Sequence, residues 1–91
     1  MHLATLRITV RIRPGLRSRR KTIRMIVAKI HQHFNVSVIE MAGSISAAET
    51  VIGVAALGTS RREVREILDR VADAVAAHPR ADVLGVDQSD H

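Results

Sequence analysis

Hydrophobic and polar residues alternate through the first stretch of the chain, which is typical of a β-strand with one buried face. The apolar positions are Leu6, Ile8, Val10 and Ile12. Pro14-Gly15 ends the alternation, and Ser18 is then placed to cap a helix. The apolar residues of that helix recur at helical spacing and are Ile23, Ile26, Val27, Ile30 and Phe34. The pattern therefore predicts a strand followed by a helix.

The rest of the chain repeats this order after a β-branched stretch, residues 36–41, and a connection over residues 42–48. Residues 50–57 form an apolar run that predicts a strand. Ser60 and Glu63 have the spacing of a capping box. The helix that they begin carries Val64, Ile67, Leu68, Val71 and Val75. Pro79 closes it, and residues 81–86 predict a last strand.

This order, βαββαβ, predicts an α+β fold of the ferredoxin-like type. Right-handed crossovers give a four-stranded antiparallel sheet with both helices on one face and the first and third strands at its centre. We expect one domain over residues 1–87 and a flexible tail over residues 88–91. The topology places the end of the first strand, the start of the first helix and the 42–48 connection at one end of the sheet. His31, His33, Asn35 and Ser60 belong to the opposite end.

Charge is strongly segregated along the chain. Nine lysines and arginines and no acidic residue precede Glu40, whereas five basic and nine acidic residues lie from Glu40 onward. The two parts carry +9 and −4, which gives the net charge of +5. A basic segment of this kind predicts a polyanionic partner but does not identify it.

The candidate phosphate-binding residues gather around the start of the first helix. They are Arg13, Arg17, Arg19, Arg20, Lys21 and Arg24. Cations at a helix N-terminus oppose the helix dipole at a cost of about 0.3–1 kcal/mol each, and a bound anion would relieve that cost. In the alternative reading, the same residues form a solvated face or pair with distant carboxylates such as Glu40 or Glu49.

Three segments resemble a known family. They are Leu16 to Lys21 (LRSRRK) followed by Ile23, Phe34 to Glu40 (FNVSVIE), and Val51 to Ala55 (VIGVA). They are similar to the SLKEKR, FNVSVAE and LGVA runs of the YlxP-like family, small bacterial proteins of unknown function. The resemblance spans residues 3–86 and implies a ferredoxin-like fold. The family's genes tend to lie among translation and ribosome-maturation genes, which implies a role linked to RNA, so the partner that we expect is RNA or a ribosomal particle.

The chain departs from the family pattern in two places. Ser18 stands where the family usually has glutamate. The connecting loop usually carries aspartate, tryptophan and arginine, and Ile45, Ala47 and Glu49 stand there instead. Whatever the family does with that loop is expected to be altered or lost in this chain.

Catalytic and metal chemistry are disfavoured, so we expect a non-enzymatic protein without a cofactor. Arg17 and Asn35 are the residue types that acylphosphatases use on a similar fold, but the predicted topology puts them at opposite ends of the sheet. His31 and His33 are two positions apart, which points them in different directions on a helix, and no third metal ligand follows at a suitable spacing. Base stacking on the sheet is also disfavoured, because Phe34 is the single aromatic residue.

Self-association is the second functional hypothesis. The strand over residues 50–57 is apolar on both faces, although helices cover only one. A second copy of the chain is the simplest cover for the open face, while Arg7 and Arg11 on that face argue against a fully dry interface. The longest apolar run is too short to span a membrane, the first residues lack the pattern of a signal peptide, and cysteine is absent, so we expect a cytoplasmic protein.

Overall fold

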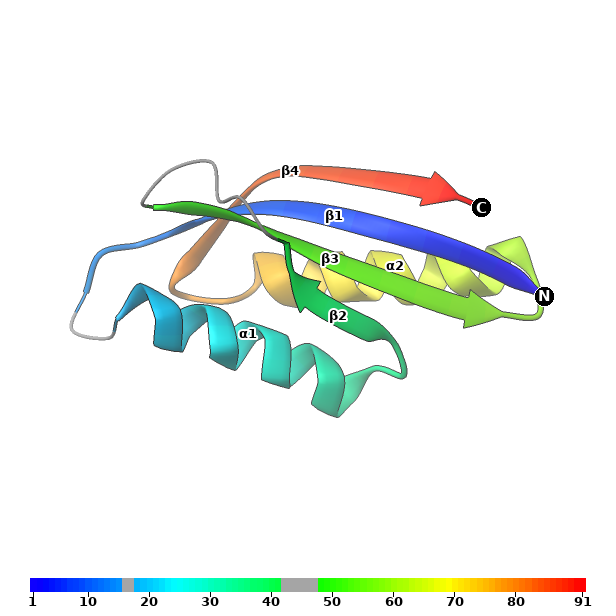
Figure 1. The fold of residues 1–91 in the computed structure, drawn as a ribbon, viewed down its shortest axis with the longest axis horizontal. Coiled ribbons are helices and arrows are strands. Elements are labelled where there is room, and N and C mark those ends of the chain that lie inside the picture. Colours follow the sequence, from blue (N-terminus) through cyan, green and yellow to red (C-terminus); the bar gives the residue numbers. More distant parts are fainter. Residues whose placement is uncertain (16–17, 42–47) are drawn as a thin grey trace.

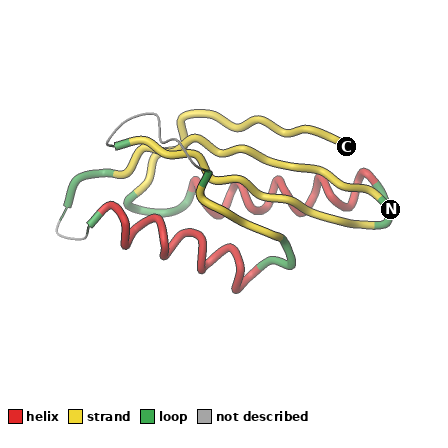
Figure 2. The backbone as a smooth tube through the Cα atoms, viewed as in Figure 1, coloured by secondary structure: helices red, strands yellow, loops and turns green. Residues whose placement is uncertain are grey.

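All six predicted elements are present in the predicted order in the computed structural model, which describes residues 1–15, 18–41 and 48–91. The elements are β1 (His2–Ile12), α1 (Arg19–His33), β2 (Ser37–Glu40), β3 (Glu49–Gly58), α2 (Arg61–Ala76) and β4 (Ala81–Asp90). Pairing is antiparallel throughout the sheet, whose strand order is β2-β3-β1-β4. Both helices lie on one face of the sheet (Figure 1, Figure 2). This arrangement confirms the ferredoxin-like α+β fold and the central position of β1 and β3.

The core forms between the helices and the even-numbered residues of the two central strands. Side chains such as Leu6, Ile8 and Ile52 are almost fully buried there. The apolar stripe of α2 meets them with Val64, Leu68, Val71 and Val75. The stripe of α1 buries Ile23, Ile26 and Ile30, whereas Val27 and Phe34 at its margins are only partly buried. The residues of opposite parity form the open face of the sheet.

Serine side chains cap both helices, as the sequence predicts. Ser18 Oγ accepts a hydrogen bond from the Lys21 backbone N–H, and Ser60 Oγ accepts one from the Glu63 backbone N–H, each at 3.2 Å. The Glu63 carboxylate does not complete the capping box on Ser60. It accepts hydrogen bonds from the Thr59 hydroxyl at 2.7 Å and the Thr59 N–H at 3.1 Å. These bonds lower the pKa of Glu63, the one from the hydroxyl most strongly.

The last strand is longer than the sequence predicts. β4 continues past Val86 to Asp90, so the tail expected over residues 88–91 is corrected to a strand that pairs with β1 through Asp90. Asp90 lies 3.2 Å from Arg65 and 3.6 Å from Arg61, both on α2. The His91 N–H donates to the Leu3 carbonyl at 2.9 Å. Polar contacts, rather than burial of apolar side chains, hold the end of β4 in place.

Candidate nucleic-acid interface

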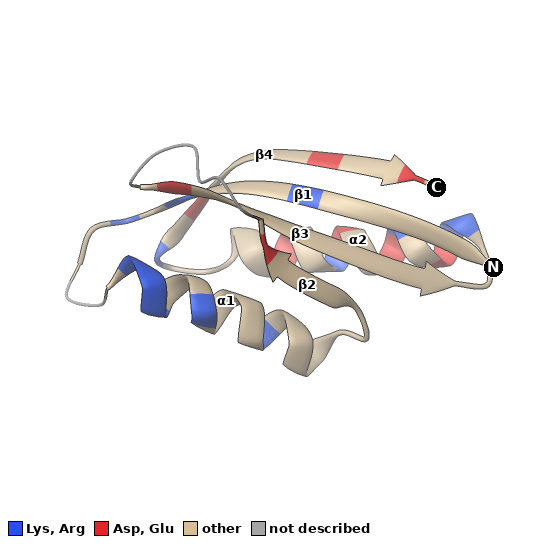
Figure 3. Cartoon of the chain, viewed as in Figure 1, with Lys and Arg blue, Asp and Glu red and all other residues tan. Residues whose placement is uncertain are grey.

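The predicted basic cluster lies where the ends of several elements meet. The Arg13 N–H donates to the Arg80 carbonyl at 2.8 Å, and the Ile12 N–H donates to the Ala48 carbonyl at 2.9 Å. These bonds bring the segment after β1 beside the starts of β3 and β4. Figure 3 shows that α1 carries only basic bands and β4 only acidic ones. Each of these two elements therefore carries charge of a single sign, basic on α1 and acidic on β4.

Arg13 is engaged by a carboxylate of the same chain. Its Nε lies 3.1 Å from both carboxylate oxygens of Asp82, and its Nη1 donates to the Pro79 carbonyl at 3.2 Å. The hydrogen bond from Arg13 lowers the pKa of Asp82, and the same bond raises the pKa of Arg13. The guanidinium is thus directed toward β4 rather than toward α1.

Arg20 and Arg19 also have internal partners. Arg20 Nη1 lies 2.6 Å from the Glu40 carboxylate, whose other oxygen accepts a hydrogen bond at 2.9 Å from the buried hydroxyl of Thr50. Arg19 is half-buried and donates to the Glu49 backbone carbonyl at 3.2 Å. Glu40 therefore links α1 to the β2–β3 pair. The alternative reading of the sequence, pairing with distant carboxylates, describes Arg20.

Lys21 and Arg24 are the remaining members of the predicted set that the structure describes, since Arg17 lies outside the described residues. Both side chains are exposed on α1. Neither forms an ion pair with any carboxylate of residues 1–15, 18–41 or 48–91. The first turn of α1 contains no acidic residue. The outward side of this helix therefore presents uncompensated positive charge at Lys21 and Arg24. Arg20, which is in an exposed ion pair, lies beside them.

The opposite end of α1 carries the two histidines considered as metal ligands. Within the described part of the chain, no three histidine or acidic side chains are grouped in a way that could hold a metal ion. Neither α1 nor α2 is long and apolar enough to cross a membrane.

Two features of the structure were missed by sequence reasoning. Asp82 was not expected to bind Arg13, because the strand register that joins them includes an irregularity between Thr9 and Val10. An apolar groove between the helices, lined in part by Lys29 and His78, was not expected either. The only sequence signal for the groove is the position of Lys29 and His33 beside the apolar stripe of α1.

The fold and the basic helix define a small α+β protein of ferredoxin-like topology with a cationic α1. The chain belongs to the family described as protein of unknown function (DUF503), whose model matches residues 2–88. No curated protein matches the chain.

Proposed function

We propose that this protein is a non-enzymatic binding module that contacts RNA phosphates through the outward side of α1. The observation that supports the proposal best is the composition of that helix. Its 15 residues include five lysines and arginines and no acidic residue. A helix of this charge attracts a polyanion over several ångströms, and phosphate contacts supply most of non-specific nucleic-acid affinity.

The proposed contact surface is narrower than the six residues that the sequence predicts. Lys21 and Arg24 are its centre because they face solvent without a carboxylate partner in the described residues. Arg20 is its third member. Its side chain is 63% exposed, and an exposed ion pair of this kind is worth only about 0–1 kcal/mol, so a phosphate can displace Glu40. Arg13 and Arg19 contribute less because both are held by other strands.

Recognition by shape and charge is the mode that we propose, rather than base reading. Phe34 is the single aromatic residue, and it packs partly buried against the core on the helix side of the sheet. Without aromatic residues on the open face, bases have no stacking platform there. The similarity to the YlxP-like family agrees with an RNA-linked role, and we propose on that basis a bacterial, cytoplasmic protein that associates with ribosomal particles.

RNA affinity of paired alanine variants tests this function. Lys21→Ala/Arg24→Ala removes two positive charges from the outward side of α1. Arg62→Ala/Arg70→Ala removes two from α2, where both residues are also exposed. Alanine favours helices, so both variants should fold. Fluorescence anisotropy with a labelled single-stranded RNA should show weaker binding for the α1 variant alone. Equal losses in the two variants, or no binding by the wild type, would contradict the proposal.

A second candidate function is homodimerisation through the open face of the sheet. Ile39 and Leu57 are 61% and 58% exposed there, and Leu3 is 38% exposed. Ile39 also lines a shallow apolar hollow of about 310 Å³ around Gly53. A Cβ on Gly53 would lie 3.2 Å from Met41 Cγ, so the glycine leaves room for that side chain. A second copy would remove this apolar surface from water.

Charge on the open face bears on this candidate. Arg11, which argued against a dry interface, lies 3.4 Å from Glu49 on the neighbouring strand. Arg7 stands opposite Asp87 in the register of β1 and β4. Apart from Ser37 and Glu49, the β2–β3 side of the face is therefore apolar, and the β1–β4 side carries both signs of charge. Two copies related by a two-fold axis can bury the apolar sides against each other.

Sedimentation at micromolar concentration tests the dimer. Ile39→Asp should shift a dimer to monomer, because it places a charge in the proposed contact. Met25→Asp introduces the same charge at a 44% exposed position on α1 and should leave the dimer intact. A monomeric wild type would remove this candidate.

A further inference from the structure

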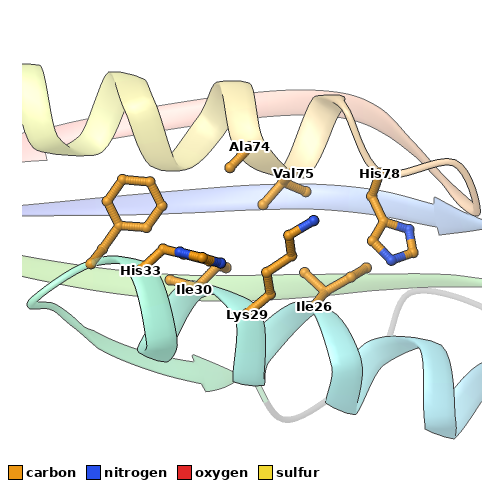
Figure 4. Close-up of a pocket in the computed structure, with 8 residues that line it drawn as sticks. Ile26, Lys29, Ile30, His33, Ala74, Val75 and His78 are labelled. Atoms are coloured by element: carbon orange, nitrogen blue, oxygen red, sulfur yellow. The ribbon is translucent and has the colours of Figure 1, made fainter.

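An apolar groove runs between α1 and α2 and is separate from the outward side of α1 (Figure 4). Its volume is about 290 Å³. Five apolar residues form much of its surface and are Ile26, Ile30, Phe34, Ala74 and Val75. Ile26, Ile30 and Val75 are core residues that are 2% exposed, so the base of the groove is the hydrophobic core itself.

The polar residues of the groove are all basic. They are Lys29, His33 and His78, and no carboxylate lies among the lining residues. Figure 4 shows Lys29 and His33 reaching into the gap from α1 and His78 entering it from the segment after α2. A groove with an apolar base and with an ammonium group and two imidazoles at its rim is complementary to a ligand with an apolar body and an anionic head.

The hydrogen bonding of His78 makes its Nε2–H the group that can donate to a ligand. The Arg80 backbone N–H donates to His78 Nδ1 at 3.1 Å, which leaves the proton of the neutral ring on Nε2. Burial lowers the pKa of His78, and the positive charges of Lys29 and Arg80 lower it further. Lys29 and His78 line the same groove from opposite sides, so both can approach one bound anion.

From the volume, the apolar base and the ammonium and imidazole donors at the rim, we propose that this groove binds a small amphipathic carboxylate. The aliphatic part would lie on Ile26, Ile30 and Val75, and the carboxylate would accept hydrogen bonds from Lys29 and His78. At the ~30 Å³ that a water molecule occupies in the liquid, the groove holds about ten non-hydrogen atoms. Octanoate has that size. For so few atoms we expect a dissociation constant on the order of 0.1–10 mM.

This site is independent of the proposed RNA contact. Lys29 and His33 lie on the flank of α1 that faces α2, whereas Lys21 and Arg24 are not part of the groove lining. Failure of RNA binding would therefore leave the proposal for the groove standing, and failure of carboxylate binding would leave the RNA proposal standing.

Titration with octanoate, followed by ¹H–¹⁵N NMR, tests the site. We expect saturable shifts at Ile30, Ala74 and His78, with weaker shifts elsewhere. Lys29→Gln should weaken octanoate binding at least fivefold. Lys21→Gln, which removes the same charge from the outward side of α1, should leave it unchanged. Octanol, which has the same chain and no charge, should bind both variants and the wild type alike.

A second variant separates the cavity from the charge. Ala74→Leu enlarges a half-buried side chain that lines the groove and should reduce octanoate binding while Lys29 is retained. Absence of saturable shifts, shifts spread evenly over the surface, or equal binding by Lys29→Gln and the wild type would each overturn the proposal. So would octanoate binding that appears only after the protein is diluted, because a second copy of the chain would then occupy the groove at higher concentration.

Discussion

Glu40→Gln should strengthen RNA binding, because the Glu40 carboxylate competes with phosphate for Arg20. The two groups lie 2.6 Å apart, and Glu40 also accepts a hydrogen bond from Thr50. Glutamine keeps an oxygen that can accept the bond from Thr50 and removes the negative charge. The substitution therefore frees one guanidinium on the proposed contact surface with little change in packing.

The expected magnitudes follow from exposure and charge. Arg20 is 63% exposed, so losing the ion pair should lower the free energy of unfolding by only about 0.2–1 kcal/mol. One added phosphate contact should steepen the dependence of log affinity on log salt by about 0.7 for a single strand. That change corresponds to about fivefold tighter binding at 0.1 M salt, if the added contact contributes nothing at 1 M.

The assay is fluorescence anisotropy of a labelled RNA over a series of salt concentrations. Glu66→Gln is the matched control, because it removes a carboxylate from the Arg62–Glu66 ion pair on α2, whose atoms are 3.1 Å apart. Both variants gain one unit of net charge and free one arginine. If the two variants steepen the salt dependence equally, net charge alone explains the binding, and the reasoning that assigns α1 as the contact surface is refuted.

Three further predictions concern stability and protonation. Leu68→Ala, at a side chain that is 0% exposed, should lower the free energy of unfolding by about 2–5 kcal/mol in urea titrations, whereas Leu84→Ala, at a 44% exposed position, should change it by less than about 0.5 kcal/mol. Asp90→Asn removes both ion pairs to α2 and should speed amide hydrogen exchange near the end of β4; unchanged exchange there would contradict the role given to Asp90. The pKa of His78 in NMR titrations should fall below the ordinary value of 6.5. With this lower pKa, the unfolded chain binds a proton at His78 more readily than the folded chain does. The free energy of unfolding should therefore decrease as the pH falls below 6.5. His78→Gln should remove this pH dependence.

The sequence was sufficient to predict the fold because its periodicities are regular. Two helical stripes and the alternating pattern of the first strand specify which faces are buried, and serine caps mark both helix starts. The end of β4 was not predictable in the same way. Residues 87–90 contain no apolar alternation, and their pairing depends on contacts of Asp90 with α2 that appear only once the chain is folded.

The candidate site was predictable in position but not in its charge balance. Strand order brings Arg13, Arg19 and Arg20 to one end of the sheet, and topology alone gives that result. Their partners depend on side-chain reach and register. Glu40 was anticipated as a partner, whereas Asp82 was not. The groove between the helices depends on the distance between the two helices on the sheet, which the periodicity of the sequence does not specify.

The irregular pairing of β1 with β4 has a consequence for how copies of this protein can meet. Thr9 pairs with Gly85 and Val10 with Val83, so Leu84 is an extra residue that bends the border strand of the sheet. The same strand carries Asp82, Asp87 and Asp90 and no basic residue. A kinked and acidic border is a poor template for extending the sheet with a strand of another molecule, because like charges would face each other along the seam. Side-by-side pairing of two copies through β4 is therefore disfavoured.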